Sequence, residues 1–309
     1  DGISKYEYAY HLDAHLLSIF LKKKSIELWV QYHEWIVECV SDSQWQITAV
    51  KYKQDYISCD FVVDCSGFHS QIIDRDKNNT FISFQNELIC NKALFARSQQ
   101  DQNYPVYTLS SAMDFGWRWR IPLQHMYGNG YVFSDTFISV EDAKKEFSAK
   151  TWIPMEQMRL VSFHPWYYKM SWYNNSLSIG LSTGFVEPLE ATGIYFICKQ
   201  LDLFWENIIW WEMYNNWALQ KKYNRTIEEI YIQVKDFIVF HYTSSKRNDT
   251  PFWNYYKNIY NFSDSFQKIS SDIKSSKSIS LKNCCISHKS HNSLISIFKL
   301  SKSHSLLSV

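Results

Sequence analysis

Glu190, Thr192 and Gly193 lie together in IGLSTGFVEPLEATGIYF, a segment that runs from a strand through a glycine turn into a helix. The first N–H groups of a helix have no acceptor within it, and its N-terminus carries roughly half a positive charge. Thr192 and Gly193 would present such N–H groups, so they could bind an anion without Lys or Arg. Helix capping by Glu187 or Glu190 explains the same pattern. The segment alone leaves both interpretations open.

A second candidate site follows the strand in FVVDCSGFHSQII. Asp64, Ser66 and Gly67 come where this strand ends, and α/β sheets bind nucleotides in the crevice outside the carboxyl ends of their strands. Gly67 would allow a ligand to approach the backbone closely. A tight turn from strand to helix, without a ligand, is the simpler alternative.

The third candidate is GWRWRIP, in which Trp117 and Trp119 alternate with Arg118 and Arg120. This alternation predicts a strand with one apolar and one polar face. Two tryptophans on one face could form the wall of a flat aromatic site, or they could simply fill a core.

Several elements must position these residues. The spacing of apolar side chains predicts helices over residues 8–21 (amphipathic), 141–149, from about 191 to 217, and 226–242. Short runs rich in β-branched and aromatic residues predict strands over residues 26–30, 35–40, 45–52, 56–65 and 176–182, with a further β-rich region over 81–138. Within that region, Asn129-Gly130 is a hairpin signal. The mixture predicts an α/β, or mixed α+β, fold.

The composition changes after about Ser263. The last 47 residues contain 16 Ser and 7 Lys against two acidic residues. Such a segment has too little apolar surface to bury, which predicts an irregular, poorly packed tail. We therefore expect one domain over residues 1–262 and a tail over 263–309.

Overall composition excludes some classes of function. The 309 residues are 46% apolar and carry a net charge of +1, from 32 basic and 31 acidic side chains. This balance lacks the basic surface of a nucleic-acid-binding protein, and no apolar stretch approaches the roughly 18 residues of a membrane span. The seven cysteines are scattered without a CxxC spacing, which favours reduced thiols and a cytoplasmic location. We expect neither nucleic acid nor membrane as a partner, and no metal site.

In order along the chain, YAYHLDA, FVVDCSG, GWRWRIP, FVEPLEATGIYF and HYTSSKRNDTPFW resemble the flavin-dependent tryptophan halogenases over about residues 8–253. The resemblance implies a fold similar to that of flavin monooxygenases. It also implies that FAD, reduced by a separate flavin reductase, and oxygen convert chloride or bromide into hypohalous acid. This acid would halogenate an electron-rich aromatic substrate such as tryptophan or another indole. A homodimer is one assembly that we expect.

The resemblance also assigns roles to individual residues. Glu190 matches the catalytic carboxylate beside the substrate, and Thr192 and Gly193 match the backbone groups that bind halide. The positions that match cofactor contacts are His33, Gly67, Leu181, Gly184 and Ile194. The positions that match the substrate side are Trp117, Trp119, Tyr242, Asn248, Phe252, Trp253 and Asn254. The paired tryptophans resemble those that keep organic substrate away from the flavin.

The chain departs from the family pattern in two ways. His241 stands where many members have a second Tyr, and Asn248 where they have an acidic residue that pairs with the substrate ammonium. These changes leave room for another indole, a phenol or a carrier-bound substrate. A GxGxxG phosphate loop and a catalytic Lys normally precede the YAYHLDA helix, and this chain has neither.

We therefore expect a flavin-monooxygenase-like FAD fold that lacks its first βαβ unit and includes a helical substrate-binding portion. A non-catalytic remnant of such an enzyme and a flavin hydroxylase are the alternatives. The WxWxIP and PLEATGI elements argue against the hydroxylase.

Overall fold

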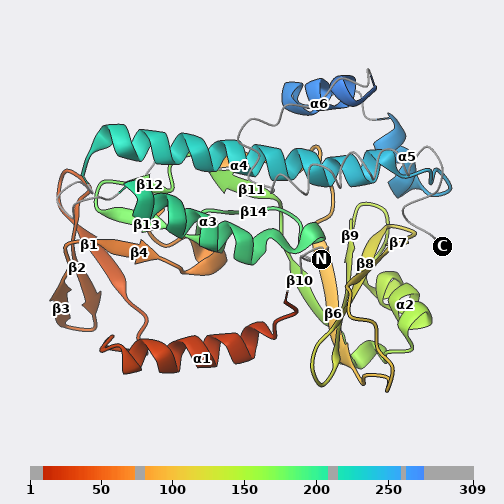
Figure 1. Ribbon diagram of the computed structural model, residues 1–309, viewed down its shortest axis with the longest axis horizontal. Helices are drawn as coiled ribbons and strands as arrows, with labels where there is room; N and C mark the ends of the chain where they lie inside the picture. Colours follow the sequence, from red (N-terminus) through yellow and green to blue (C-terminus); the bar gives the residue numbers. More distant parts are fainter. Residues whose placement is uncertain (1–9, 74–80, 208–214, 259–261, 275–309) are drawn as a thin grey trace, which may run out of the picture. The chain divides into compact units, whose positions relative to one another are not determined.

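A computed structural model describes residues 10–73, 81–207, 215–258 and 262–274. The described residues form two compact units. The first comprises the N-terminal part up to Trp35 together with Lys92–Ser162, and the second comprises Ile36–Asn91 and the chain from Phe163 onward. Figure 1 labels helices and strands of both units.

The first unit is built on a five-stranded antiparallel sheet. Its strand order is β10-β6-β9-β8-β7, with bounds β6 Lys92–Ser98, β7 Leu109–Met113, β8 Gly116–Pro122, β9 Tyr127–Phe133 and β10 Arg159–Ser162. The alternation in GWRWRIP thus correctly predicts a strand.

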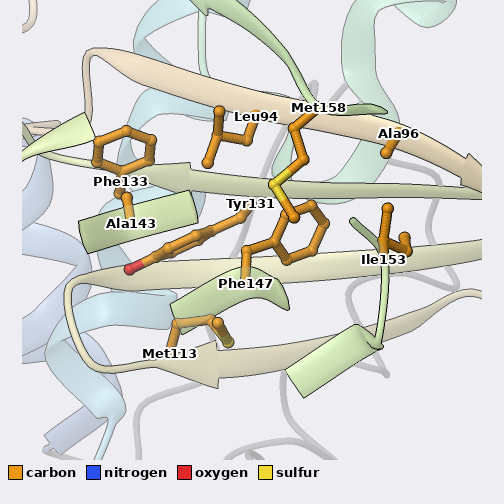
Figure 2. Close-up of a cluster of buried hydrophobic side chains, with 9 residues drawn as sticks. All are labelled: Leu94, Ala96, Met113, Tyr131, Phe133, Ala143, Phe147, Ile153 and Met158. Carbon is orange, nitrogen blue, oxygen red and sulfur yellow. The ribbon is translucent and has the colours of Figure 1, made fainter. Parts of the chain in front are cut away.

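Helix α2 (Val140–Thr151) closes one face of this sheet. Ser139 caps it by accepting a hydrogen bond from the Asp142 N–H. Figure 2 shows the core that results, in which Phe147 and Ala143 from α2 meet Tyr131 and Phe133 from β9. The helix predicted over 141–149 is therefore confirmed, and its inner residues are buried rather than on the surface.

The hairpin predicted at Asn129-Gly130 is wrong, because both residues lie within β9. Gly130 pairs with Trp119 on β8 and with Phe95 on β6. The turn lies earlier, where the Leu123 N–H donates to the Met126 carbonyl. Strand β9 pairs with β6 on one side and with β8 on the other. This pairing satisfies backbone N–H and C=O groups of Asn129 and Gly130, which a two-residue turn would leave unpaired, so the two residues stay extended.

Gly130 has a packing role in this sheet. The Trp119 ring lies over it, so an added Cβ would sit 2.0 Å from ring carbon atoms. Trp117 lies beside Trp119 with ring centroids 5.6 Å apart, and it is only 4% exposed. The Trp119 indole therefore occupies space that is free only because Gly130 on β9 has no side chain.

Helix α1 (Ala14–Glu27) precedes the sheet in the chain and differs from its prediction. Asp13 caps it by accepting from the N–H groups of His15 and Leu16. The helix continues to Glu27, and Trp29 then adopts a left-handed backbone, so the strand predicted over 26–30 is wrong. The expected amphipathic pattern is also wrong, because none of the residues of α1 is buried.

The second unit contains three small sheets. An antiparallel meander consists of β1 (Glu38–Ser41), β2 (Ile47–Tyr52) and β3 (Asp55–Ser58). A second sheet has the order β14 (Gly184–Phe185), β11 (Trp166–Tyr168) and β5 (Phe81–Ser83), and a third has β12 (Trp172–Tyr173), β13 (Ser176–Ser178) and β4 (Val62–Asp64). Strands β13 and β4 are parallel, so the two predicted glycine turns leave the sheet at the same edge.

Several predicted strands are shorter in the structure. The run over 35–40 forms strand only from Glu38, and the run over 56–65 divides into β3 and β4. The strand predicted over 176–182 ends at Ser178 and continues as the 3-10 helix η4 (Gly180–Ser182).

Four helices complete the described part of the second unit: α3 (Thr192–Asn207), α4 (Trp217–Ser244), α5 (Pro251–Asn258) and α6 (Asp264–Lys274). Helices α3 and α4 pack against each other (Figure 1). The predicted single helix over 191–217 is wrong, because α3 ends at Asn207 and Asn216 caps a new helix; residues 208–214 lie outside the described residues. The helix predicted over 226–242 lies within α4.

The predicted tail begins with ordered structure. Helix α6 follows Ser263, and its Phe266 side chain is only 4% exposed. The prediction of an irregular segment is therefore wrong for residues 264–274, while residues 275–309 lie outside the described residues. None of the described helices has both the length and the hydropathy that crossing a bilayer requires.

A buried ionic cluster joins α4 to the start of α6. The Lys235 ammonium, 1% exposed, donates to Glu87 at 2.8 Å and to the Ser263 hydroxyl at 2.6 Å, and it also pairs with Asp236. Ser263 N–H donates to Glu87 as well. One cation thus faces two carboxylates, and burial raises the pKa of Asp236.

Replacing Lys235 with Met is expected to lower the free energy of unfolding by about 3–5 kcal/mol, because it leaves two carboxylates buried without a cation. Arg225→Met on the same helix is the matched control. Its exposed pair with Glu229 contributes less than about 0.5 kcal/mol. Urea unfolding measures both variants, and equal losses would contradict the assigned role of the cluster.

Replacing Gly130 with Ala is expected to cost about 1–3 kcal/mol of unfolding free energy, because the methyl group displaces the Trp119 indole. Gly128→Ala on the same strand is the control, since an added Cβ there meets nothing within 4 Å. In protein labelled with 5-fluorotryptophan, the fluorine resonance assigned by Trp119→Phe should shift only in Gly130→Ala. An unmoved resonance would show that the ring does not depend on Gly130.

Candidate active site at the start of helix α3

The chain reaches helix α3 through an unusual backbone turn. Glu190 has φ 70° and Ala191 has φ 53°, both in the left-handed region that costs a residue with a side chain about 1–2 kcal/mol. The Ala191 N–H donates to the Pro188 carbonyl at 2.9 Å. Because such strain persists only where the surrounding structure enforces it, the turn is a candidate functional feature.

Thr192 and Gly193 form the first turn of α3, as the sequence predicts. The 3-10 helix η5 (Leu189–Ala191) runs directly into this turn, so of the two N–H groups the one on Gly193 is the candidate donor to a ligand. Nothing lies within 4 Å of the position of a Cβ on Gly193, and the first turn contains no acidic residue. The position can therefore accept a small anion; halide binding itself stays a prediction.

Glu190 contacts His241 from the last turn of α4. Glu190 Oε1 lies 3.0 Å from His241 Nε2, and the Glu190 side chain is 44% exposed. The hydrogen bond from His241 lowers the pKa of Glu190 below its ordinary value. The candidate catalytic carboxylate is thus ionised at neutral pH and accessible, and the sequence contained no local signal for its pairing with His241.

Buried hydrogen bonds hold the backbone around the start of α3. The Ser182 hydroxyl donates to the Asp64 carbonyl at 2.6 Å, and the Gly180 N–H donates to the Gln200 side chain at 2.8 Å. The Asp64 carboxylate accepts from the N–H groups of Ser66 and Ile72. Sequence reasoning placed Asp64 at the end of its strand but missed both its carboxylate contacts and Gln200.

Gly67, Leu181 and Ile194 lie on three elements of this scaffold, of which η4 contacts the other two. Gly67 opens the 3-10 helix η1 (Gly67–His69), which contacts η4, and η4 in turn contacts α3. Gly67 has φ 69° with open space where a Cβ would be, and the Leu181 and Ile194 side chains are exposed. An accessible apolar surface beside a bare backbone fits a flat aromatic cofactor such as a flavin.

Gly184 has a different reason to be glycine. An added Cβ would lie 2.6 Å from the Trp166 carbonyl oxygen on β11, so strand packing already requires it. Strand packing therefore explains why this position is a glycine, and the predicted contact of Gly184 with a flavin stays a prediction.

His33 lies in irregular chain between α1 and β1, in the first unit. It is exposed and stacks on Trp35 with ring centroids 4.1 Å apart. Its contact with a cofactor stays a prediction. Trp117 and Trp119 belong to the same unit, whereas the other predicted site residues belong to the second.

Three predicted substrate residues are enclosed by protein. Tyr242, Phe252 and Trp253 are all buried, and the Tyr242 ring stacks on Tyr256 with centroids 4.4 Å apart. The Tyr242 hydroxyl donates to the buried Glu187 carboxylate, and burial raises the pKa of Tyr242. These rings pack together in the interior of the second unit, and their direct contact with substrate stays a prediction.

The remaining predicted substrate residues, Asn248 and Asn254, are exposed. On either side of Asn248 in the chain, Arg247 and Asp249 form a two-pronged ion pair, with Nε and Nη2 of Arg247 at 2.9 and 2.7 Å from the carboxylate. Asp249 is the one acidic residue of the loop from Ser245 to Thr250, and its carboxylate is therefore already paired with Arg247.

Comparisons with known proteins identify the family. The tryptophan halogenase family profile matches residues 1–297. Tryptophan 6-halogenase ThaL of Streptomyces albogriseolus is 34% identical over 255 residues, which cover 80% of this chain and 48% of that protein. Tryptophan 7-halogenase RebH of Lentzea aerocolonigenes is 34% identical over 261 residues, with 82% and 49% covered. The chain thus spans about half the length of these relatives.

Solved structures agree with the sequence comparison. The flavin-dependent halogenase Xcc4156 from Xanthomonas campestris superposes with a TM-score of 0.80 at 27% identity, covering 86% of this chain and 54% of that one. The tryptophan 6-halogenase SttH from Streptomyces toxytricini gives a TM-score of 0.79 at 29% identity, with 88% and 54% covered. The mixed α/β fold and the predicted family are both confirmed: the chain belongs to the tryptophan halogenase family.

Proposed function

We propose that the full-length protein is a flavin-dependent halogenase that attaches chlorine or bromine to an electron-rich aromatic ring, such as that of tryptophan or another indole. The observation that carries this proposal is the juxtaposition at the start of α3. An ionised, accessible carboxylate on Glu190 directly precedes the first turn of α3 at Thr192 and Gly193, with open space beside the Gly193 backbone. An anion and a proton acceptor would thereby lie within one short segment.

FAD would lie against Gly67, Leu181 and Ile194, because these residues combine open backbone with exposed apolar side chains. Once reduced by a separate flavin reductase, it would supply the oxidation of halide by oxygen. Trp117 and Trp119 would separate the organic substrate from the flavin, which favours oxidation of the halide over oxygenation of the ring.

Chloride or bromide would bind the main-chain N–H groups of Thr192 and Gly193. The dipole of α3 and the N–H groups without helical acceptors suffice for one anion. No Lys or Arg lies among the residues from Gly180 to Cys198, so no side-chain cation competes for that role.

Glu190 would accept the proton that the ring loses. When hypohalous acid delivers its halogen, the halogen–oxygen bond breaks, its electron pair leaves on oxygen as hydroxide that is protonated to water, and a carbon–halogen bond forms with a pair of ring electrons. The C–H bonding pair then returns to the ring, and the proton passes to the Glu190 carboxylate. An ionised carboxylate is needed for this step, which the lowered pKa of Glu190 supplies at neutral pH.

Among these aromatics, we propose that those without a free ammonium beside the ring are better substrates than free tryptophan. Asn248 is uncharged, and Asp249 is bound to Arg247, so the loop offers no carboxylate for such an ammonium. Simple indoles, phenols and carrier-bound aromatics satisfy this condition. Buried aromatic rings at Tyr242, Phe252 and Trp253 are suited to support a flat substrate.

The halogenation assay combines the full-length protein, FAD, a flavin reductase, oxygen and chloride or bromide with tryptophan, indole and phenol. Mass spectrometry should detect halogenated indole or phenol, formed only when halide is present. Glu190→Gln should lower the rate at least about 100-fold, because it removes the proton acceptor, while flavin absorbance of the purified protein stays unchanged. Hydroxylated products without halide dependence would indicate a flavin hydroxylase, and no bound flavin would indicate a non-catalytic remnant.

Gly193→Pro tests the halide site. Proline is tolerated in the first turn of a helix but removes one N–H donor, so the half-saturating bromide concentration should rise at least about tenfold. Gly193→Ala is the matched control, because it keeps the N–H and its Cβ meets nothing within 4 Å. Equal bromide dependence in the two variants would remove this N–H from the halide site.

A further inference from the structure

His241 and Glu190 form a contact that requires a shared proton. His241 Nδ1 lies 2.8 Å from the Phe237 carbonyl, and Nε2 lies 3.0 Å from Glu190 Oε1. A carbonyl oxygen can only accept, so Nδ1 carries a hydrogen. The lone pair of a neutral Nε2 would face a carboxylate lone pair. A second proton, held between Nε2 and Oε1, turns this contact into a hydrogen bond.

Two helix ends favour keeping that proton on the imidazole. His241 lies in the last turn of α4, where the helix dipole stabilises a cation. Glu190 lies just before the first turn of α3, where the opposite end of a dipole stabilises an anion. Both fields oppose transfer of the proton to Glu190, which agrees with the lowered pKa of that carboxyl group.

The other charged groups on the adjoining segments are engaged elsewhere. Glu187 accepts a hydrogen bond from Tyr242, and the first turn of α3 contains no acidic residue. On α4, Lys235 binds Glu87 and Asp236. The ammonium of Lys257 on α5 donates to the carbonyls of Thr243 in the last turn of α4 and of Ser245, its C-cap. Among the described residues, His241 is therefore the group recorded as pairing with Glu190.

We propose that His241 is a positioning residue that holds one oxygen of the Glu190 carboxylate and leaves the other oxygen to take the proton released from the aromatic ring. The proposal rests on the halogenase function above. A half-exposed glutamate has several rotamers, and the left-handed backbone of Glu190 determines only where its Cβ points. The contact with a histidine that is itself held by Phe237 removes the remaining freedom of the carboxylate.

The experiment compares two substitutions in the full-length protein. His241→Gln can keep a donor near the position of Nε2, and His241→Asn can keep only the one near Nδ1. The first readout needs no activity: the carboxyl resonance of Glu190, labelled with carbon-13 and assigned by Glu190→Gln, is titrated with acid. Its midpoint should rise in His241→Asn and less in His241→Gln, because a hydrogen bond to the ionised form is lost.

The second readout is the pH dependence of halogenation. Since His241 keeps Glu190 ionised to lower pH, the acid limb of kcat should move to higher pH in His241→Asn. On the plateau, kcat should fall about tenfold while the KM for the aromatic substrate changes less than about twofold. His241→Gln should recover most of the plateau rate.

The outcomes separate this proposal from the proposed function. An unchanged Glu190 midpoint in His241→Asn, or equal acid limbs in the variants and the wild type, would overturn the positioning role. The Glu190 titration midpoint could instead shift in His241→Asn while the protein halogenates none of the aromatics. That result would support the contact between His241 and Glu190 but overturn the proposed halogenase reaction.

Discussion

The position of the α3 N-terminus depends on buried hydrogen bonds between segments that are far apart in the sequence. Ser182 joins η4 to the end of β4 at Asp64, and Gln200 joins η4 to the second half of α3. Each of these groups is buried, so removing the Gln200 side chain would leave the Gly180 N–H without this acceptor, at a cost of about 1–3 kcal/mol. This penalty is what keeps the backbone donors of the first turn in a defined place.

The same constraint makes the unusual conformation of Glu190 possible. Consecutive left-handed residues would relax in a free loop, but here Pro188 precedes them and a fixed helix follows. The carboxylate is thereby directed toward α4 rather than into the capping position of α3. A capping glutamate would give its oxygens to the helix N–H groups, whereas this one leaves them available for an anion.

Aromatic packing provides rigidity on both units by different means. In the first unit a glycine on β9 makes room for the Trp119 ring, so the missing side chain is as important as the large one. In the second unit Tyr242 combines ring stacking with a hydrogen bond to Glu187. Such an arrangement buries apolar area while satisfying the hydroxyl, which suits a wall beside a flat ligand.

The sequence by itself determined the strand GWRWRIP, the helix start at Thr192, the β-meander and the family, because these depend on periodicity and on residues close together in the chain. Tertiary structure decided that Asn129-Gly130 is extended, that α3 and α4 are separate helices, and that His241 meets Glu190. For Asn129-Gly130 and for His241 a partner distant in sequence supplies the hydrogen bond, and local propensities of a few tenths of a kcal/mol cannot outweigh it; the start of α4 instead depends on the local cap by Asn216.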